Sequence, residues 1–356
     1  MRALMVVAEL GSGGAETMVD DLARGLTAQG DDVTAVSNGG WRAELLAADG
    51  LATLTVPLRA RDPRSLLRAV LAIRREARRR PVDVVHAHNV RAALAARLGT
   101  QRLRRRPPLV CTVHGLADED YPQAARLLGR CADLVVAVSG DVRDRLVEAG
   151  LDPGAVQVVE NATAGVETPD RAAARRELGL DPDRAAALCV ARLAAPKRHD
   201  LLVAAWGSLP GDALLLVAGD GPERENVARL VAEAGLTERI TLLGDRRDVD
   251  RLLAASDALV LASDREGLPV SVLEAMSAGV PVVASAVGGL LALDAATVEL
   301  VVPGSAADLA RGVSRVLDDP VRHAALSAAG RALWEERFTS AAMLAAYRGL
   351  YAVVAG

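Results

Sequence analysis

The polar residues with the clearest chemical use lie in the segment Glu266-Gly-Leu-Pro-Val-Ser-Val-Leu-Glu274. Pro269 suits the first position of a helix, which would leave the N–H groups of residues 270–272 free to face an anion. Glu266 in the preceding loop and Glu274 one turn onward then place a carboxylate on each side of this helix end. Since carboxylates do not bind phosphate directly, we expect them to accept hydrogen bonds from sugar or ribose hydroxyls. The alternative is a structural role for both in capping and solvation.

Two cations follow the expected strand Ala186–Val190. Arg192 comes directly after it, and Lys197, the sole lysine of the chain, lies at the expected start of the next helix. A lysine in a chain that otherwise uses arginine is compatible with a need for a point charge. The turn Gly219-Asp-Gly-Pro222 follows the next strand. These residues therefore share the carboxyl ends of parallel strands, where open α/β sheets bind ligands. Loop cations without a ligand are the alternative.

The turn Gly11-Ser-Gly-Gly14 follows the first expected strand and opens a helix near Ala15. Glycines let backbone N–H groups approach a phosphate, and the helix N-terminus adds partial positive charge. A dinucleotide fingerprint would have a third glycine at position 16, where this chain has Glu16. The turn therefore favours phosphate binding but argues against a dehydrogenase. A tight turn without a ligand is the alternative.

Three histidines and one acidic pair could also serve a site. His86 and His88 lie two residues apart at a strand end, which could form a metal pair, but the sequence nearby offers no obvious third ligand. His114 ends another strand beside Gly115 and could reach a cleft, although a structural histidine is the alternative. The acidic pair Asp248-Val-Asp250 begins a helical stretch, where capping explains it better than metal binding.

Short β-branched runs alternate with longer amphipathic stretches, the pattern of βα units and a parallel sheet. A helix is expected from a cap at Asp62 to about Arg79, and helix is expected from Val302 to the C-terminus. The strands form two series. The first comprises Ala3–Ala8, Val33–Ser37, Thr53–Val56, Val82–His86, Leu109–Val113, Leu134–Val138 and Val156–Val159, and the second Ala186–Val190, Leu214–Ala218, Ile240–Leu243, Leu259–Leu261, Val282–Ser285 and Leu300–Val302.

The two series indicate two domains. At 356 residues the chain is about twice the usual size of one domain. The break between the series is near residues 162–180, where the segment Ala162–Asp170 has the composition of a linker. We expect an N-terminal Rossmann-like domain over residues 1–165, a C-terminal one over 166–338, and a final helix over 339–356 that packs back on the first domain.

Composition excludes several classes of protein. The hydrophobic share of 51% with 25% charged residues is typical of a globular protein. Three Trp, three Tyr and one Phe offer little for stacking on nucleic acid bases, so we expect no nucleic acid partner. Three cysteines in apolar runs and an N-terminus without a secretory pattern favour reduced thiols and a cytoplasmic location. Arginines at 78–80 and 102–106 could contact acidic lipid at the inner membrane face, or be solvated helix ends.

Taken together, these segments resemble glycosyltransferase family 4, whose members have two facing Rossmann-like domains, the GT-B arrangement. The resemblance spans nearly the whole chain. It rests on Gly13-Gly-Ala-Glu16, His86-Ala-His-Asn89, Val113-His-Gly115, Ala191-Arg-Leu193 with Lys197, Gly219-Asp-Gly-Pro-Glu223, and most specifically Glu266 to Met276 running on through Gly279-Val-Pro-Val-Val283.

The resemblance implies roles for these residues. Arg192 and Lys197 would hold a diphosphate, Glu274 a ribose, and Glu266 with the amides after it the donor sugar. Residues 246–249 would border the base, and the glycines near the N-terminus would approach the donor from the first domain. The implied catalytic residues are His114, Arg192, Lys197 and Glu266, and the implied donor-binding residues are Gly13, Gly14, Arg192, Lys197, Gly219, Arg246, Val249, Glu266, Gly267, Leu268, Pro269, Val270, Ser271 and Glu274.

The resemblance also implies a reaction. The family is associated with transfer of a sugar from a nucleotide-diphospho-sugar with retention of anomeric configuration and without a bound metal, so we expect no cofactor. A UDP-sugar is favoured and a GDP-sugar is possible, with an unidentified glycan, lipid-linked glycan or small metabolite as acceptor. His114 would orient or polarise groups near the sugar. The alternatives are a nucleotide-sugar epimerase on the same fold and a non-catalytic relative that binds nucleotide-sugar.

Overall fold

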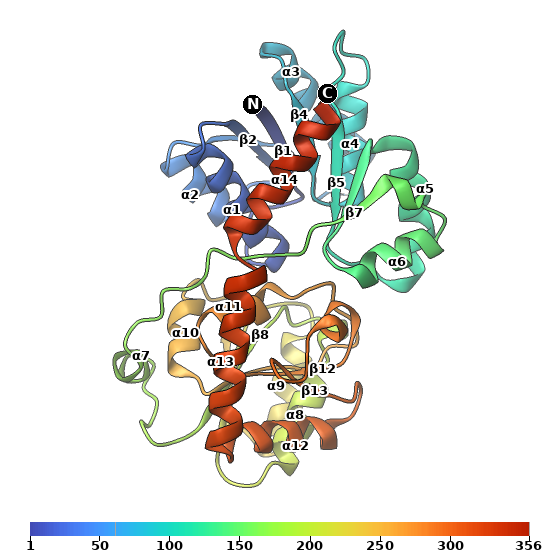
Figure 1. Ribbon diagram of the computed structural model, residues 1–356. Helices are drawn as coiled ribbons and strands as arrows, with labels where there is room; N and C mark the ends of the chain where they lie inside the picture. Colours follow the sequence, from blue (N-terminus) through green and yellow to red (C-terminus); the bar gives the residue numbers. More distant parts are fainter. Residues whose placement is uncertain (61, 356) are drawn as a thin grey trace. The chain divides into compact units, whose positions relative to one another are not determined.

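The computed structural model describes residues 1–60 and 62–355, so Gly356, the last residue of the expected final helix, lies outside the described residues. The chain forms two compact units (Figure 1). Unit 1 comprises Met1–Ala164 together with the C-terminal segment that begins at Ser340, and unit 2 comprises Gly165–Thr339. Each unit is a parallel sheet covered by helices.

The described part of unit 1 contains a seven-stranded sheet in the order β3-β2-β1-β4-β5-β6-β7, and all of its paired strands are parallel. The order reverses beside β1, which pairs with both β2 and β4. The strands are β1 (Arg2–Val6), β2 (Asp32–Ser37), β3 (Ala52–Thr55), β4 (Val84–Ala87), β5 (Leu109–Val113), β6 (Leu134–Ala137) and β7 (Val156–Val158).

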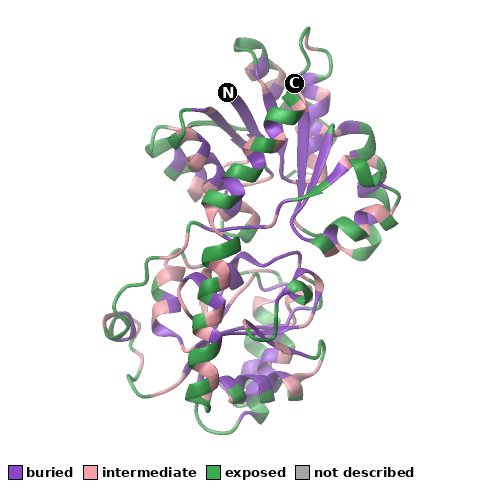
Figure 2. Cartoon of the chain, in the orientation of Figure 1, coloured by how far each residue is buried: buried purple, intermediate pink, exposed green. Residues whose placement is uncertain are grey.

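Helices cover both faces of this sheet because its inner strands are apolar on both sides (Figure 2). Along β1, Ala3 and Met5 face one hydrophobic cluster, whereas Leu4 and Val6 face another. The first cluster includes α1, α2 and α14, and the second includes α3 to α6. The helices are α1 (Gly14–Ala28), α2 (Trp41–Ala48), α3 (Pro63–Arg79), α4 (Val90–Thr100), α5 (Tyr121–Cys131), α6 (Gly140–Glu148) and α14 (Ser340–Ala355).

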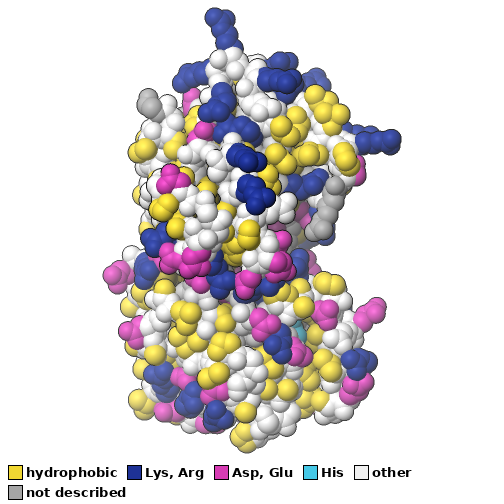
Figure 3. Space-filling model, turned by 90° about the vertical axis from the view of Figure 1, so that its right-hand side faces the viewer, with side chains coloured by type: hydrophobic (Ala, Val, Ile, Leu, Met, Phe, Trp, Pro, Cys, Tyr) yellow, Lys and Arg dark blue, Asp and Glu magenta, His cyan; other side chains and the backbone are white. Residues whose placement is uncertain are grey.

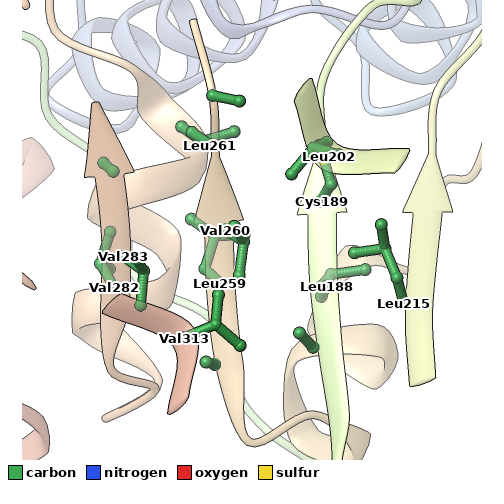
Figure 4. Close-up of a cluster of buried hydrophobic side chains, with 14 of the residues drawn as sticks. Leu188, Cys189, Leu202, Leu215, Leu259, Val260, Leu261, Val282, Val283 and Val313 are labelled. Carbon is green, nitrogen blue, oxygen red and sulfur yellow. The ribbon is translucent and has the colours of Figure 1, made fainter. Parts of the chain in front are cut away.

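The described part of unit 2 contains a six-stranded parallel sheet in the order β10-β9-β8-β11-β12-β13. Its core is one hydrophobic cluster in which side chains of β8, β9, β11 and β12 pack against those of α8 and α12 (Figure 4). The strands are β8 (Ala186–Val190), β9 (Leu214–Ala218), β10 (Ile240–Gly244), β11 (Ala258–Leu261), β12 (Val282–Ser285) and β13 (Glu299–Val301), and the helices are α7 (Arg171–Glu177), α8 (His199–Ser208), α9 (Arg224–Glu233), α10 (Val249–Ala255), α11 (Val270–Ser277), α12 (Ala306–Leu317) and α13 (Pro320–Arg337).

The expected α/β architecture is confirmed, and each expected strand lies within two residues of an observed one. The helix expected over 63–79 is present, with the Asp62 carboxylate accepting a hydrogen bond from the Ser65 N–H. After Val302 the described chain is helical as expected, in the three successive helices α12, α13 and α14. Asp319 accepts from the N–H groups of Val321 and Arg322 and so starts α13, which separates this helix from α12. All three cysteines are free and buried.

The last helix completes the core of unit 1. Met343, Leu344, Tyr347 and Tyr351 of α14 are buried in the same cluster as the inner face of α1. A side chain at Gly25 of α1 would crowd Leu344, so the two helices approach closely. Within residues 1–60 and 62–355, we find no helix whose length and apolar character would suffice to cross a bilayer.

Candidate functional site

The structure joins two of the expected site residues of unit 2 in an ion pair. The Lys197 Nζ atom lies 2.6 Å from Oε1 of Glu266, and the Ser263 hydroxyl donates to the same oxygen at 2.6 Å. The Glu266 side chain is only 7% exposed, whereas Lys197 is 27% exposed. The carboxylate is therefore held in place by two donors while the ammonium stays accessible from solvent.

The loops that carry this pair are also tied through their neighbours. The Asp264 N–H donates to the Pro196 carbonyl at 2.9 Å, and Nη1 of Arg198 donates to Asp264 Oδ1 at 2.9 Å. Hydrogen bonds from Arg198 to Asp200 and Asp264 raise the pKa of the Arg198 guanidinium. These contacts fix the segment that positions Lys197.

The sequence suggested that Lys197 lies at the start of the next helix, but the structure places it before that helix. It ends a short 3-10 turn over Ala195–Lys197, and α8 begins at His199. Between them Arg198 has a φ of 48°, and no other non-glycine residue among those described has a positive φ. The left-handed conformation is unfavourable in free energy for a residue with a side chain. Because the carboxylates of Asp200 and Asp264 hold the Arg198 side chain, the backbone of this segment is constrained.

Arg192 differs from Lys197 in being unpaired. Its side chain is exposed, and its guanidinium forms neither a hydrogen bond nor an ion pair with the residues that the structure describes. Gly219, with a φ of 139°, lies so close that a Cβ there would overlap the Ala191 carbonyl oxygen. The loop after β9 thus packs on the residue preceding this free cation.

The N-terminus of α11 differs from expectation by one residue. Pro269 is the N-cap, with extended backbone angles, and the first helical residue is Val270. The Val272 N–H donates to the Pro269 carbonyl at 3.1 Å, so the expectation that this N–H is free is wrong. Among the residues before and within this helix end, Gly267, Leu268, Pro269 and Val270 are buried, and Ser271 and Glu274 are half-buried.

The acidic pair at the start of α10 also has a different explanation from the expected one. Asp248 is the N-cap residue, but its side chain accepts no capping hydrogen bond. Its carboxylate instead accepts from Nε of Arg246 at 2.7 Å, and this hydrogen bond lowers the pKa of Asp248. Val249 is the first helical residue and is half-buried. Capping by the Asp248 side chain was therefore the wrong expectation.

These residues follow four neighbouring strands of unit 2. The strands are adjacent in the order β10-β9-β8-β11, and Arg246, Gly219, Arg192 and Glu266 follow them in that order. Parallel strands present their carboxyl ends at one edge, so the residues line a single edge of the sheet. Gly13, Gly14 and His114 belong to unit 1 and are not part of this row.

In unit 1 the glycine turn precedes α1 as expected, with Gly13 as the N-cap and Gly14 as the first helical residue. A Cβ at Gly13 would overlap the carboxylate of Glu16, because this side chain folds back over the turn. A carboxylate near the positive end of α1 is stabilising. Glu16 therefore has a local structural role where a dinucleotide-binding turn has glycine.

Three imidazoles lie close together at the carboxyl ends of β4 and β5. The ring centroids of His86 and His88 are 4.0 Å apart, and those of His88 and His114 are 5.8 Å apart. His86 is fully buried, with Nε2 2.7 Å from Thr112 Oγ1 and Nδ1 2.7 Å from the Tyr351 hydroxyl. Both ring nitrogens of His88 and of His114 are buried without a partner in the described residues.

Burial keeps these rings neutral. It lowers the pKa of His86 to about 3 and that of His114 to about 4, and it holds the pKa of His88 well below its ordinary value. The rings of His86 and His88 are tilted by 41° to each other. The described residues contain no cluster of three or more His, Cys, Asp or Glu arranged to hold a metal ion. A neutral His114 can donate or accept a hydrogen bond without adding charge.

Several residues of these sites gave no signal in the sequence. Arg198 acts through a contact with Asp264, 66 residues away, and no spacing indicates such a contact. Ser263 bonds Glu266 three residues further along the same loop, and a lone serine in a loop does not indicate this bond. Tyr351 reaches His86 from 265 residues further along the chain. The tyrosines of the final helix could have indicated that this helix packs against a core, because an apolar helix after the last strand must be buried. They do not indicate that the partner of Tyr351 is His86.

Two family models match the chain. Residues 12–163 match the model described as Glycosyltransferase Family 4, and residues 170–333 match the one described as Glycosyl transferases group 1. Among solved structures, Anabaena HepE in complex with UDP-glucose is 22% identical, with a TM-score of 0.88 over 99% of this chain and 100% of that chain, and shares the fold.

Two curated relatives give the sequence similarity. The chain is 37% identical over 201 residues to the 2-deoxystreptamine glucosyltransferase of Streptomyces kanamyceticus, covering 52% of each protein. It is 33% identical over 316 residues to the D-inositol 3-phosphate glycosyltransferase of Rhodococcus jostii, covering 78% of this chain and 69% of that protein. The matched part thus spans about half the length of the first relative.

The neutral histidines predict acid lability. Unfolded histidines bind protons below about pH 6.5, whereas the folded rings stay neutral until about pH 4. The unfolded state therefore takes up more protons as the pH falls, and the free energy of unfolding should decrease by about 1.4 kcal/mol per pH unit for each such histidine. Urea unfolding at pH 7.5, 6.0 and 5.0 measures the slope.

The His114→Gln variant serves as the control, because it removes one titrating ring and should reduce the slope by one proton. A free energy of unfolding that stays constant from pH 7.5 to 5.0 would contradict the neutral assignment.

Proposed function

The chain belongs to glycosyltransferase family 4, and from this membership we propose that it transfers a sugar from a nucleotide-diphospho-sugar to an acceptor hydroxyl with retention of anomeric configuration. The observation that carries the proposal is the row of residues at one edge of the unit 2 sheet. It combines an accessible ammonium at Lys197, an unpaired guanidinium at Arg192 and a fixed carboxylate at Glu266. Cations suit a diphosphate, and a carboxylate suits hydroxyls.

The donor of the proposed reaction is a UDP-sugar, with a GDP-sugar as the second choice. The support is the neighbouring Anabaena structure with UDP-glucose and a relative named as a glucosyltransferase. We assign the diphosphate to Arg192 and Lys197, the ribose to Glu274, and the base to the segment 246–249. The acceptor is a glycan, a lipid-linked glycan or a small metabolite.

In the proposed reaction the bond between the anomeric carbon and the diphosphate oxygen breaks, and its electron pair goes to that oxygen. The acceptor hydroxyl attacks from the same face and gives its proton to the leaving phosphate oxygen. Arg192 and Lys197 stabilise the charge that develops on the diphosphate, which is the work a metal ion performs in other enzymes. His114, kept neutral by burial that lowers its pKa to about 4, supplies a hydrogen bond rather than a charge.

The test is an assay of the purified protein with UDP- and GDP-sugars in the presence of EDTA. A nucleotide-sugar at about a hundred times its dissociation constant should add about 2.7 kcal/mol of stability, so a thermal shift identifies the donor. NMR of the product gives the anomeric configuration. Transfer that stops with EDTA and returns with Mg²⁺ or Mn²⁺ would contradict the metal-free mechanism. An epimerised donor without acceptor would indicate an epimerase, and binding without turnover a non-catalytic relative.

We also propose that unit 1 contacts an anionic membrane surface through α3. Leu67 and Leu71, one helical turn apart, are 57% and 52% exposed on this helix. The exposed guanidinium groups of Arg64, Arg68 and Arg75 flank them and bond to no described residue. Exposed leucines beside arginines suit the boundary between lipid headgroups and acyl chains.

The loop after α4 extends this basic surface. The Arg74 guanidinium donates to the carbonyls of Leu98 and Gly99, which ties the end of α3 to the end of α4. The exposed Arg102, Arg104 and Arg105 follow directly. Figure 3 shows arginine and apolar side chains gathered together on one face of unit 1. The proposed location is therefore cytoplasmic and peripheral to the inner membrane face.

The assignment of the two cations predicts the effect of their removal. Arg192→Ala and Lys197→Ala should each slow sugar transfer by roughly a hundredfold or more, as loss of a preorganised charge partner commonly does. Steady-state kinetics with saturating donor measure the change. Arg229→Ala is the control, because Arg229 pairs with Glu233 on the exposed face of α9, and its rate should be unaltered. Folded Arg192 and Lys197 variants with near-native rates would refute the assignment.

The membrane proposal predicts selective vesicle binding. The protein should sediment with vesicles of phosphatidylcholine and phosphatidylglycerol but not with phosphatidylcholine alone. Each removed arginine of α3 should weaken binding roughly fivefold, from about 1 kcal/mol per charge. The pair Leu67→Ser and Leu71→Ser should weaken it further, whereas Leu45→Ser on α2, also exposed, should not. Equal binding to both kinds of vesicle would count against this surface.

A further inference from the structure

The ion pair of unit 2 places a carboxylate where the proposed function requires an anion to bind. We infer that Glu266 is the internal counter-ion of Lys197 and competes with the diphosphate for it, so that the site favours a nucleotide-sugar over the bare nucleoside diphosphate. This inference rests on the proposed function and deepens it. The competition arises because one ammonium must serve both the Glu266 carboxylate and the incoming phosphate oxygens.

The two oxygens of Glu266 have different surroundings. Oε1 accepts hydrogen bonds from both Lys197 and Ser263, each at 2.6 Å. Oε2 accepts none from the part of the chain that the structure describes. One oxygen thus neutralises the lysine, and the other is available to a further hydrogen-bond donor. A carboxylate accepts only, so its natural partner from a ligand is a hydroxyl.

The two cations of the site are therefore not equivalent before ligand binds. Arg192 is exposed and bonds to no residue that the structure describes, so it can receive a phosphate at once. The Lys197 ammonium must instead leave Glu266, or bond to Glu266 and to the phosphate together. Lys197 cannot avoid this choice by moving its backbone. The neighbouring Arg198 is held by Asp200 and Asp264, and the Asp264 N–H is bonded to the Pro196 carbonyl.

The backbone of Glu266 is equally fixed. Gly288, with a φ of 51°, lies so close that a Cβ there would overlap the Glu266 carbonyl oxygen, and the Gly289 N–H donates to that oxygen at 3.3 Å. The carboxylate therefore stays beside the phosphate site even when Lys197 turns to a ligand. A like charge held in place at short range disfavours an anion.

The consequence differs for donor and product. A nucleotide-sugar brings hydroxyls that can bond to the Glu266 carboxylate and so offset the loss of its lysine. A nucleoside diphosphate lacks the hydroxyls of the transferred sugar, and its terminal phosphate carries an additional ionisable oxygen. Glu266 should thus weaken binding of the product more than binding of the donor, which promotes release of the nucleotide after transfer.

The test compares UDP and UDP-glucose binding in the wild type and in Glu266→Gln by isothermal titration calorimetry. The glutamine keeps the shape of the side chain without the charge. UDP should bind about tenfold more tightly to the variant, while UDP-glucose gains less or binds more weakly. The ratio of the two dissociation constants should therefore change in favour of UDP. Unchanged or weaker UDP binding in a folded variant would overturn the inference.

Asp264→Asn is the matched control. It removes a carboxylate from the same loop that bonds Arg198 rather than Lys197, and Arg198 keeps its bonds to Asp200. Its UDP affinity should stay within about twofold of the wild type. Equal tightening in both variants would mean that total charge, and not competition for Lys197, governs the affinity, and the inference would fail.

The sole lysine provides a second measurement that needs no variant. In protein labelled with [¹³C]lysine, the ε-methylene group of Lys197 gives one unique signal. Addition of UDP should shift this signal, because the ammonium exchanges a carboxylate for a phosphate. UDP binding that leaves it in place would overturn the inference even if Glu266→Gln did not fold. If the wild type binds neither UDP- nor GDP-sugars, nor the free nucleotides, the proposed function itself fails.

Discussion

The ion pair between Lys197 and Glu266 joins the loops that follow β8 and β11, two strands that are adjacent in the sheet although far apart in sequence. Ser263, Arg198 and the backbone of Asp264 reinforce this junction. Charge therefore positions the residues of the candidate site, and the apolar sheet beneath them provides a rigid base. The charges that we propose to bind the donor therefore also hold these two loops together.

In unit 1 the candidate site residues are held by burial and ring packing rather than by ion pairs. His86 is enclosed by Thr112 and by Tyr351 of α14. His88 lies beside it and stacks on His114, and the ring nitrogens of His88 and His114 have no polar partner among the described residues. Burial excludes charge from this stack, so the two units offer contrasting chemistry. One edge presents fixed charges, and the other presents neutral rings whose unmet hydrogen bonds cost free energy in the absence of a partner.

The sequence predicts features that depend on neighbouring residues better than features that depend on contacts between residues far apart in the chain. Strands such as Leu109–Val113 were predictable because consecutive apolar residues indicate a strand buried on both faces. The segment from Glu266 to Glu274 was predictable as a site, but the bond from Val272 to Pro269 depends on where the helix starts within one residue. The pairing of Lys197 with Glu266 and the left-handed conformation of Arg198 depend on loops meeting in space, which no local pattern encodes.

The chain leaves unit 1 at Ala164 and returns at Ser340, where the Ser340 N–H donates to the Thr163 carbonyl and Asp21 accepts from both crossing segments. Because α14 carries part of the core, the unit made first on the ribosome is completed last. Until α14 leaves the exit tunnel, the apolar face of α1 that Leu344 covers stays open to solvent. Unit 2 is synthesised before α14, so all of its residues are present while unit 1 still lacks part of its core, and a chain released before α14 is made cannot complete its first unit.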